Sequence, residues 1–409
     1  MTPTHTAATL TPAASPMAWA SSMASRASTG ASPSADAHAM GLAREAMDDA
    51  VPPSRRVRAG RQDNPAAAMR TNVTVAGVGS YLPAGRLSSD DVQAKVTATS
   101  GLALPPGMVE RITGITTRTL MADDEQCSSL AAAACRDLFA RTGVDPASID
   151  LLIFASASRD MVEPATSHIV QAALGTQAHC FDLTNACNSL LNGIDVASAM
   201  LSTGRASRAV VCAGEAPSRA VRWDIADFDM LIDHFAGFTF GDAGAALLLT
   251  RTDDPLAAVG SEGSGITYLD AVAHSEHWQV GGLFGGGSRH PRGEEWTYFR
   301  GDGRHLLAAF EQAGDAMLRR TLEATGTTYD DYRYVLVHQV TDSYLAKFCI
   351  AAGVPRDRLV PTVTRYGNLA AATLGVQLAE VYDTLTSEDR VLFIGLGGGI
   401  SLTTMVWQK

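Results

Sequence analysis

The chain has 409 residues, of which 46% are hydrophobic and 18% are charged. At about 100 to 200 residues per domain, this length suits two globular domains. No stretch provides the roughly 20 apolar residues that a membrane-spanning helix needs, so we expect no membrane segment. The 32 Lys and Arg residues are outnumbered by 43 Asp and Glu residues, giving a net charge of -11. Because there is also no basic block, a nucleic-acid partner is not expected.

The six cysteines show no CxxC spacing and occur in apolar or mixed surroundings. This pattern predicts reduced thiols in a cytoplasmic protein. An acidic cluster between Asp224 and His234 could resemble a metal site. Its members alternate with apolar residues at helical spacing, which indicates a solvated helix face. We therefore expect no bound metal.

Residues 1–70 differ in composition from the rest of the chain. Ala, Ser, Thr and Pro dominate, and no acidic residue precedes Asp36. Such a segment cannot bury enough apolar surface to offset its ordering entropy, so we predict a disordered extension or a start site placed too early. Met69 stands just before the first strand-like run. A targeting peptide is the alternative, although Arg is scarce in the first half of the segment.

Residues 71–253 alternate between short apolar runs and helical patterns, which predicts a layered α/β unit. The predicted strands are Val73–Val78, Leu151–Ala155, Cys180–Thr184, Ala209–Ala213 and a hairpin-like pair ending in Ala245–Thr250. The predicted helices are Ser128–Thr142, Ala165–Leu174 and Asn188–Leu201.

Residues 254–409 repeat this order of elements, so the sequence predicts two duplicated halves. The predicted helices are Leu306–Ala324, Asp342–Ala351 and Ala370–Leu385. The predicted strands are Tyr334–Val337, Leu359–Val363, Val391–Ile394 and a closing strand after the last glycine run. Residues 260–303 are rich in Gly, His and Trp and show little periodicity. We predict a long loop or cap near a functional edge there.

Cys187 is the first candidate for chemistry, because it lies where a predicted strand ends and an amphipathic helix begins. A helix N-terminus lowers the pKa of a thiol and favours the nucleophilic thiolate. A lone Cys in this position can equally be a small buried hydrophobe.

Three further candidates follow strands of the second half. His338 closes the apolar strand YVLV, and Asn368 stands before a predicted helix. The carboxyl ends of strands are where open α/β sheets place ligand-facing groups. The Gly397–Gly399 run offers backbone N–H groups to an oxyanion. The alternatives are a core histidine, a turn asparagine and a flexible turn.

Five motifs in chain order resemble one known family. They are FDLTNACNSLLNGIDVASAMLSTGRASRAVVCAGE, FGDAGAALLL, VLVHQV, RYGNLAAATLG and GLGGGIS. Together they are similar to the β-ketoacyl-ACP synthase III family of the thiolase superfamily, from about Asn72 to Lys409. The resemblance implies a five-layered αβαβα thiolase fold and a homodimer.

The resemblance also implies an active site of Cys187, His338 and Asn368, with the N–H groups of Cys187 and Gly398 as the oxyanion hole. Cys187 would take an acyl group from a thioester, and the acyl-enzyme would condense with a second thioester in a Claisen reaction. The substrates would be acyl-CoA or acyl-carrier-protein thioesters, and no tightly bound cofactor is expected. A lipid or secondary-metabolite pathway is implied.

The segment SRDMVEPATSHIVQAALG is similar to a subgroup, the head-to-head acyl-CoA condensing thiolases. In that subgroup a Glu before Pro is the base that removes an α-proton, and Glu163 holds that position here. Equally, a Glu–Pro pair suits the start of an ordinary helix.

The chain also departs from the family's starter enzymes. Met108 replaces a Trp that stacks on coenzyme A, and Ile112 replaces an Arg. These changes favour an acyl carrier protein as the donor. Two other readings stay open: an acyltransferase that uses a hydroxyl or amine acceptor, and a partner subunit of a heterodimeric synthase.

Overall fold

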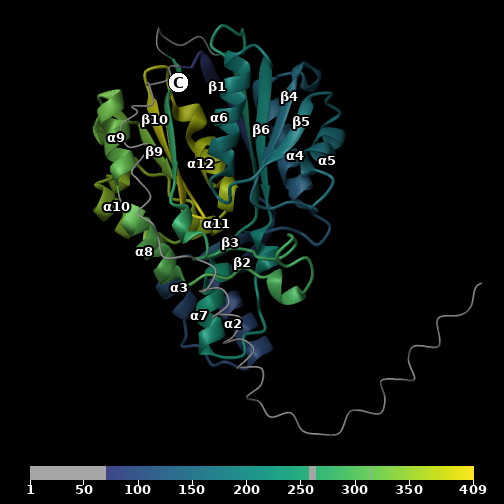
Figure 1. Ribbon diagram of the computed structural model, residues 1–409, viewed down its shortest axis with the longest axis vertical. Helices are drawn as coiled ribbons and strands as arrows, with labels where there is room; N and C mark the ends of the chain where they lie inside the picture. Colours follow the sequence, from purple (N-terminus) through teal and green to yellow (C-terminus); the bar gives the residue numbers. More distant parts are fainter. Residues whose placement is uncertain (1–70, 258–263, 314) are drawn as a thin grey trace, which may run out of the picture. The chain divides into compact units, whose positions relative to one another are not determined.

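The computed structural model describes residues 71–257, 264–313 and 315–409. The extension predicted over residues 1–70 therefore lies outside the described residues, apart from its border at Thr71. The described chain forms five layers in the order αβαβα (Figure 1). Helices α6 (Ser189–Ser202) and α12 (Thr373–Val381) lie between two sheets, and further helices cover the outer face of each sheet. Among the described helices, none combines the length and apolar character that crossing a bilayer requires.

The first sheet has the strand order β1-β7-β6-β4-β5. Its strands are β1 (Val73–Tyr81), β4 (Leu151–Ala155), β5 (His179–Leu183), β6 (Arg208–Glu215) and β7 (Ala243–Arg251). Strand β4 runs parallel to both β5 and β6, whereas β7 is antiparallel to β6 and β1. Helices α4 (Cys127–Thr142) and α5 (Thr166–Leu174) pack on its outer face.

The second sheet has the order β8-β11-β10-β9 and repeats these directions. Its strands are β8 (Gly265–Ala273), β9 (Tyr334–Val337), β10 (Arg390–Gly397) and β11 (Ser401–Gln408). Strand β9 is parallel to β10, and β11 is antiparallel to β10 and β8. Because the pairing pattern matches β4, β6, β7 and β1 strand by strand, the fold is a duplication. On the outer side of this sheet are α8 (Gly303–Ala313), α9 (Ala316–Thr325) and α10 (Asp342–Ala352).

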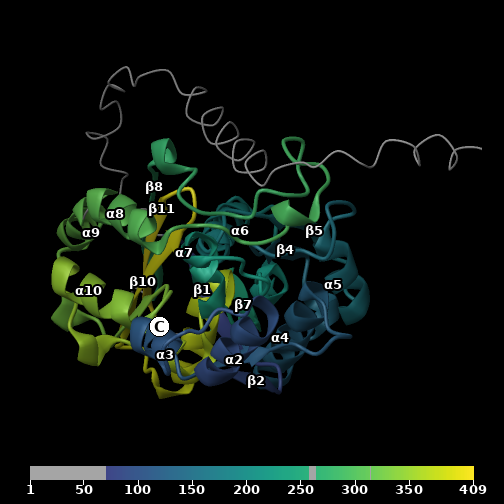
Figure 2. The same ribbon diagram turned by 90° about the horizontal axis from the view of Figure 1, so that it is seen from below.

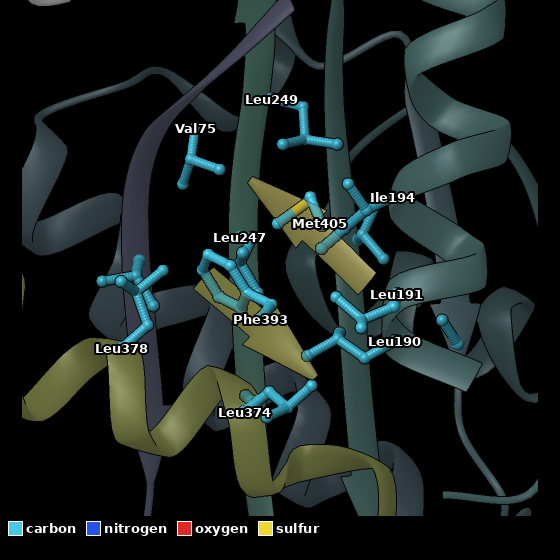
Figure 3. Packing of buried hydrophobic residues seen from close by; sticks show 14 of the residues in the cluster. Val75, Leu190, Leu191, Ile194, Leu247, Leu249, Leu374, Leu378, Phe393 and Met405 are labelled. Atoms are coloured by element: carbon cyan, nitrogen blue, oxygen red, sulfur yellow. The ribbon is translucent and has the colours of Figure 1, made fainter. Parts of the chain in front are cut away.

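The main hydrophobic core lies where the two central helices meet both sheets (Figure 3). Leu190, Leu191 and Ile194 of α6 pack there with Leu374 and Leu378 of α12. Side chains of β1, β7, β10 and β11 close the core from both sides. Burying apolar surface contributes about 25 cal/mol per Å² to the free energy of folding. Packing in this core therefore holds the two central helices in a fixed position relative to each other.

A smaller group of elements lies at the end of the sheets where their strands deliver the candidate residues (Figure 1). It comprises β2 (Gly85–Ser88), α2 (Ser89–Ser100), α3 (Met108–Thr113), β3 (Thr117–Leu120), α7 (Phe228–His234) and the short helix α11 (Val363–Tyr366). Among these elements the sequence predicted only the helical face at α7, from the acidic cluster between Asp224 and His234. The acidic cluster is only partly the solvated face that was expected, since His234 is buried and its Nδ1 lies 2.8 Å from the Phe299 carbonyl oxygen.

Five element predictions need correction. The hairpin-like pair ending in Ala245–Thr250 is the single strand β7, which pairs with β1 and β6. Leu359–Val363 is not a strand: Pro361 has no N–H to give to a sheet, and only a bridge between Leu359 and Val335 remains. The predicted helix Leu306–Ala324 is two helices, α8 and α9. The helix predicted over Ala370–Leu385 is α-helical only over Thr373–Val381, with a tighter 3-10 turn directly before and after it. The expected loop over residues 260–303 contains strand β8, although residues 258–263 are outside the described part.

Candidate active site

Cys187 lies in a tight turn between β5 and α6. Ala186, the residue before it, has a φ of 50°, a conformation that costs free energy for any residue with a side chain. The turn is held by hydrogen bonds from the Ser189 N–H to the Ala186 carbonyl (3.1 Å) and from the Ser189 hydroxyl to the same oxygen (2.7 Å). The sequence placed Cys187 correctly at a strand-to-helix junction.

The expected direction of the Cys187 pKa was wrong. Burial raises the pKa of the thiol to about 12, and the charge of Glu215 acts in the same direction. The Glu215 carboxylate ends β6 and is fully buried. It accepts hydrogen bonds from the hydroxyls of Ser156 (2.8 Å) and Ser158 (2.7 Å) and from backbone N–H groups of Ala157 and Ser158. Removal from water and a nearby carboxylate therefore outweigh the helix terminus, and the resting residue is a neutral thiol.

His338 directly follows β9 and is buried. Burial lowers the pKa of its imidazole to about 4, while a backbone hydrogen bond with Ala370 acts in the opposite direction. The ring is therefore neutral near pH 7. Its Nδ1 atom is buried and has no hydrogen-bond partner among the described residues. A neutral imidazole can both accept a proton and donate an N–H, which suits it to catalysis.

Asn368 stands in a buried loop before α12. Its backbone N–H donates to the Thr239 carbonyl (2.7 Å), and its own carbonyl accepts from the Gly241 N–H (3.0 Å). Its side-chain Oδ1 accepts from the Ala370 N–H (3.0 Å), so the amide Nδ2 is the group available to donate to a substrate. The backbone of Ala370 also hydrogen-bonds to the His338 ring, so the side chains of Asn368 and His338 have Ala370 as a common neighbour. They lie at the same edge of the second half.

The glycine turn between β10 and β11 packs directly against the Cys187 turn. A Cβ atom at Gly398 would lie 3.6 Å from Cβ of Ala186, and one at Gly397 would lie 2.9 Å from Cβ of Asn188. A Cβ at Gly395 would collide with Oδ1 of Asn188. At Gly395 and Gly397 a side chain would collide with Asn188, so glycine lets this end of β10 approach the residue that follows Cys187.

The second sheet and the central helices connect the elements that carry Cys187 and Gly398 with those that carry His338 and Asn368. The His338 N–H donates to the Ile394 carbonyl (3.0 Å), and Ile394 lies on β10 just before the glycine turn. Gly375 of α12 lies against α6, since a Cβ there would be 3.4 Å from Cδ2 of Leu190. Cys187, His338, Asn368 and Gly398 therefore stand at the ends of elements that pack on one another.

Glu163 does not join this group within the subunit. It is exposed in the loop before α5, and no hydrogen bond or ion pair between described residues uses its side chain. The alternative reading as a helix-start carboxylate is also wrong, because α5 has Ala165 as its N-cap and no acidic residue in its first turn. The neighbouring Val162 is 67% exposed.

A segment within the loop or cap predicted near a functional edge lies against the glycine turn. We define the cap as residues 274–301. The His274 N–H donates to the Ile400 carbonyl (2.7 Å), and the Gly281 carbonyl oxygen would lie 3.8 Å from a Cβ at Gly398. Gly282 pairs with Arg300 across the cap. Sequence reasoning also missed Glu215, whose only signal is a carboxylate closing a very apolar strand.

Comparison with known proteins agrees with this geometry. The family model described as 3-oxoacyl-[acyl-carrier-protein] synthase III matches residues 181–264, which include Cys187. The model of the C-terminal part of the same enzymes matches residues 322–409, which include His338, Asn368 and Gly398.

Curated relatives extend the match over most of the chain. The β-ketoacyl-[acyl-carrier-protein] synthase III of Neisseria meningitidis is 27% identical over 341 residues, which cover 82% of this chain and 98% of that protein. The enzyme of the same name from Methylococcus capsulatus is 28% identical over 330 residues, covering 80% and 96%.

Solved structures share the fold. OleA of Xanthomonas campestris has a TM-score of 0.73 at 23% identity, covering 82% of this chain and 98% of that one. The 3-oxoacyl-(acyl carrier protein) synthase III of Xanthomonas oryzae has a TM-score of 0.72 at 24% identity, covering 83% and 99%. The motifs, the duplicated five-layered fold and these matches agree: over most of its length the chain is similar to the 3-oxoacyl-[acyl-carrier-protein] synthase III enzymes.

Proposed function

We propose that this chain is a condensing enzyme that forms an acyl-Cys187 intermediate and joins it to a second acyl thioester in a Claisen reaction. The observation that carries the proposal is the packing of the Gly398 turn against the Cys187 turn, in a subunit that also buries a neutral His338 and leaves the Asn368 amide Nδ2 able to donate. One side can stabilise an oxyanion, and the other can stabilise an enolate.

In the first half-reaction, Cys187 Sγ attacks the carbonyl carbon of the donor thioester. Because the pKa of the thiol is raised, its proton needs an acceptor, and the neutral His338 imidazole is the base we assign. The N–H groups of Cys187 and Gly398 hold the tetrahedral oxyanion. The bond to the carrier sulfur then breaks, and the carrier leaves as a thiol with the proton returned from His338.

In the second half-reaction, His338 and Asn368 Nδ2 donate hydrogen bonds to the carbonyl oxygen of the second thioester. These bonds stabilise the enolate that forms at its α-carbon. The enolate attacks the acyl carbonyl, and the bond to Cys187 breaks. The carboxylate base that takes the α-proton of the second thioester gives it to the departing Cys187 thiolate, and the product is a β-ketoacyl thioester.

We further propose that the chain acts as a homodimer in which Glu163 serves the partner's active site as the α-proton base. Strand β5 is the edge of its sheet among the described strands, and an unpaired edge is a template for pairing with a second chain. The Glu163 loop precedes α5, which packs on β5, so pairing of two β5 edges would bring this loop to the partner. Among the described residues of one subunit, no hydrogen bond or ion pair links the Glu163 side chain to the Cys187 turn.

Mixed dimers test this assignment. Glu163→Gln and Cys187→Ala subunits, each inactive as a homodimer, are unfolded, mixed and refolded together. If Glu163 acts in the partner's site, each mixed dimer contains one complete site, and activity returns. If Glu163 acts within its own subunit, or if the chain is a monomer, no mixture regains activity.

An acyltransferase reaction is the second candidate, and the exposure of Glu163 is the observation that favours it, since transfer to a hydroxyl or amine needs no α-proton base. In that case Glu163→Gln would turn over at the wild-type rate while Cys187 is still acylated. For a base, loss of the carboxylate lowers turnover by about 100-fold or more.

We propose an acyl carrier protein as the donor, because Met108 and Ile112 replace the residues expected for coenzyme A recognition. We also propose a cytoplasmic location and a lipid or secondary-metabolite pathway, since all six cysteines are free thiols. Comparing acylation by the same acyl group on carrier protein and on coenzyme A tests the donor. A preference of at least tenfold for the carrier protein is expected, and an equal rate contradicts it.

A further inference from the structure

A buried polar network lies where helix α6 meets strand β11. The two elements lie beside each other between the halves of the fold (Figure 2). On β11, Met405 belongs to the main hydrophobic core, whereas Leu402 and Val406 pack on the other side of the second sheet. Because side chains alternate along a strand, Ser401 and Thr403 share the face of Met405 and are directed toward α6.

The Asn188 amide is the centre of this network. Asn188 is 1% exposed, and its Nδ2 donates to the Thr403 hydroxyl (2.7 Å) and to the Ser401 hydroxyl (3.4 Å). Asn192, one helical turn further along α6, donates to the same Thr403 oxygen (3.4 Å) and accepts from Nδ2 of Asn185 (2.6 Å). Three amides at the start of α6 therefore meet two hydroxyls on one face of β11.

Stability alone does not explain an asparagine at this position. The Asn188 Oδ1 atom is buried, has no hydrogen-bond partner among the described residues, and lies against Gly395 of β10. A buried carbonyl oxygen without a partner costs free energy, which an apolar side chain at position 188 would avoid. A buried polar network can instead fix the packing of two elements, because its hydrogen bonds form at a single relative position. In this protein the two elements are α6 and β11.

Their relative position sets the distance between the two backbone N–H groups that we assign to the oxyanion hole. Cys187 directly precedes Asn188, and Gly398 lies three residues before Ser401 in the turn that joins β10 to β11. A Cβ atom at Gly397 would lie 2.9 Å from Cβ of Asn188 and 2.7 Å from Oγ of Ser401, so both network residues pack on this turn. A shift of α6 along β11 would therefore move one N–H group relative to the other.

Resting on the proposed function, we infer that Asn188, through its hydrogen bond to Thr403, is a positioning residue for acylation of Cys187. It holds the N–H groups of Cys187 and Gly398 at the separation that a tetrahedral oxyanion needs. Asn188 acts through the two turns and takes no part in proton transfer. Its loss should weaken stabilisation of the oxyanion and leave the nucleophilicity of the thiol unchanged.

Thr403→Val tests the inference, because valine keeps the shape of threonine and removes the hydroxyl that binds Asn188. Thr404→Val is the matched control: Thr404 is equally buried, and its hydroxyl is hydrogen-bonded to that of Thr321 on the opposite face of β11 (2.7 Å). Both variants lose a buried hydrogen bond, so both should melt at a lower temperature than wild type. Acylation of Cys187 is measured with saturating acetyl, octanoyl and palmitoyl thioesters. It should fall at least ~10-fold in Thr403→Val, because a displaced donor stabilises the oxyanion less, and keep the wild-type rate in Thr404→Val.

A second reaction separates positioning from general damage to the fold. Iodoacetamide alkylates a thiol by displacement at a saturated carbon, so no oxyanion forms. Alkylation of Cys187, followed by peptide-mapped mass spectrometry, should therefore keep the wild-type rate in Thr403→Val. Thr403→Ser, which restores the hydroxyl, should regain fast acylation. The inference is wrong if Thr403→Val is acylated as fast as Thr404→Val, or if its acylation and alkylation slow by the same factor.

If Thr403→Val does not fold, Asn188→Ser is measured in the same two reactions. Slower acylation with unchanged alkylation is expected, and equal slowing of both reactions, or of neither, contradicts the inference. The wild-type enzyme separates this result from a failure of the proposed function. If wild-type Cys187 takes no acyl group from any of these thioesters on coenzyme A or on a carrier protein, the proposed function is refuted, and this inference with it.

Discussion

At the scale of single residues, the candidate site contains a Cys187 thiol with a raised pKa and a His338 imidazole with a lowered pKa, so both groups are neutral in the resting state. Both effects have the same cause, which is burial away from water. Burying a neutral thiol and a neutral imidazole costs less desolvation free energy than burying a thiolate–imidazolium ion pair. The proton is then transferred only when the substrate is bound. The sequence predicted the positions of Cys187 and His338. It could not predict these pKa directions, because they depend on how deeply the turn is covered and on Glu215.

The pH dependence of acylation follows from this pair. His338 has a pKa near 4, so its neutral, proton-accepting form persists above that pH. We expect acylation of wild-type enzyme to be flat from about pH 5.5 to about pH 8.5. In His338→Ala the thiol, with a pKa near 12, must ionise unaided, so the rate should be low and rise about tenfold per pH unit. A wild-type rate that itself rises tenfold per pH unit would show that His338 is not the base.

At the scale of elements, the oxyanion hole that we propose would depend on how closely β10 and its turn approach the start of α6. Gly395→Ala would press a methyl group against the Asn188 amide, which is fixed by a hydrogen bond to the Thr403 hydroxyl (2.7 Å). We expect a loss of about 1 to 3 kcal/mol in the free energy of unfolding, together with slower acylation. Gly398→Ala is the stability control, because its methyl group would meet only ordinary contacts, and its melting temperature should match wild type. Equal melting temperatures for the two variants would contradict this view of the turn.

The sequence predicted strands correctly where both faces of a strand are buried and its residues form a continuous apolar run, as in LLIFA of β4 and YVLV of β9. It failed at LVPTV, where a similar run is interrupted by Pro361 and the second sheet stops one strand short of the first. In the first sheet the corresponding position is β5, the edge strand that precedes Cys187. Strand β8 was missed because it lies in a Gly-rich stretch and shows its pattern only when paired with β11.

At the scale of the whole molecule, the duplication explains why chemistry from distant parts of the sequence meets. Cys187 and Asn368 each precede a central helix, and packing of α6 beside α12 brings both to one edge. This convergence could be predicted from the motifs only through the family resemblance. The exposure of Glu163 and the polar network around Asn188 required the structure.

The segment before Met69 is predicted to be dispensable. The described chain is already anchored at Thr71, whose hydroxyl donates to the Ile266 carbonyl (3.0 Å) next to the start of β8. A chain that starts at Met69 should therefore keep the melting temperature and the oligomeric state of the full chain, as measured by calorimetry and analytical ultracentrifugation. A loss of more than about 1 kcal/mol, several degrees for a domain of this kind, would show that the segment stabilises the fold.

The proposed acyl-Cys187 intermediate is tested directly by peptide-mapped mass spectrometry after brief incubation with an acyl thioester. Wild-type enzyme should gain the mass of one acyl group per subunit, on the peptide that contains Cys187, and lose it when a second thioester is added and a β-ketoacyl product forms. Cys187→Ala should show neither the added mass nor the product, while Cys180→Ala, which replaces a half-buried thiol on the neighbouring strand, should show both. Acylation on another cysteine, or product formation by Cys187→Ala at the wild-type rate, would contradict the account.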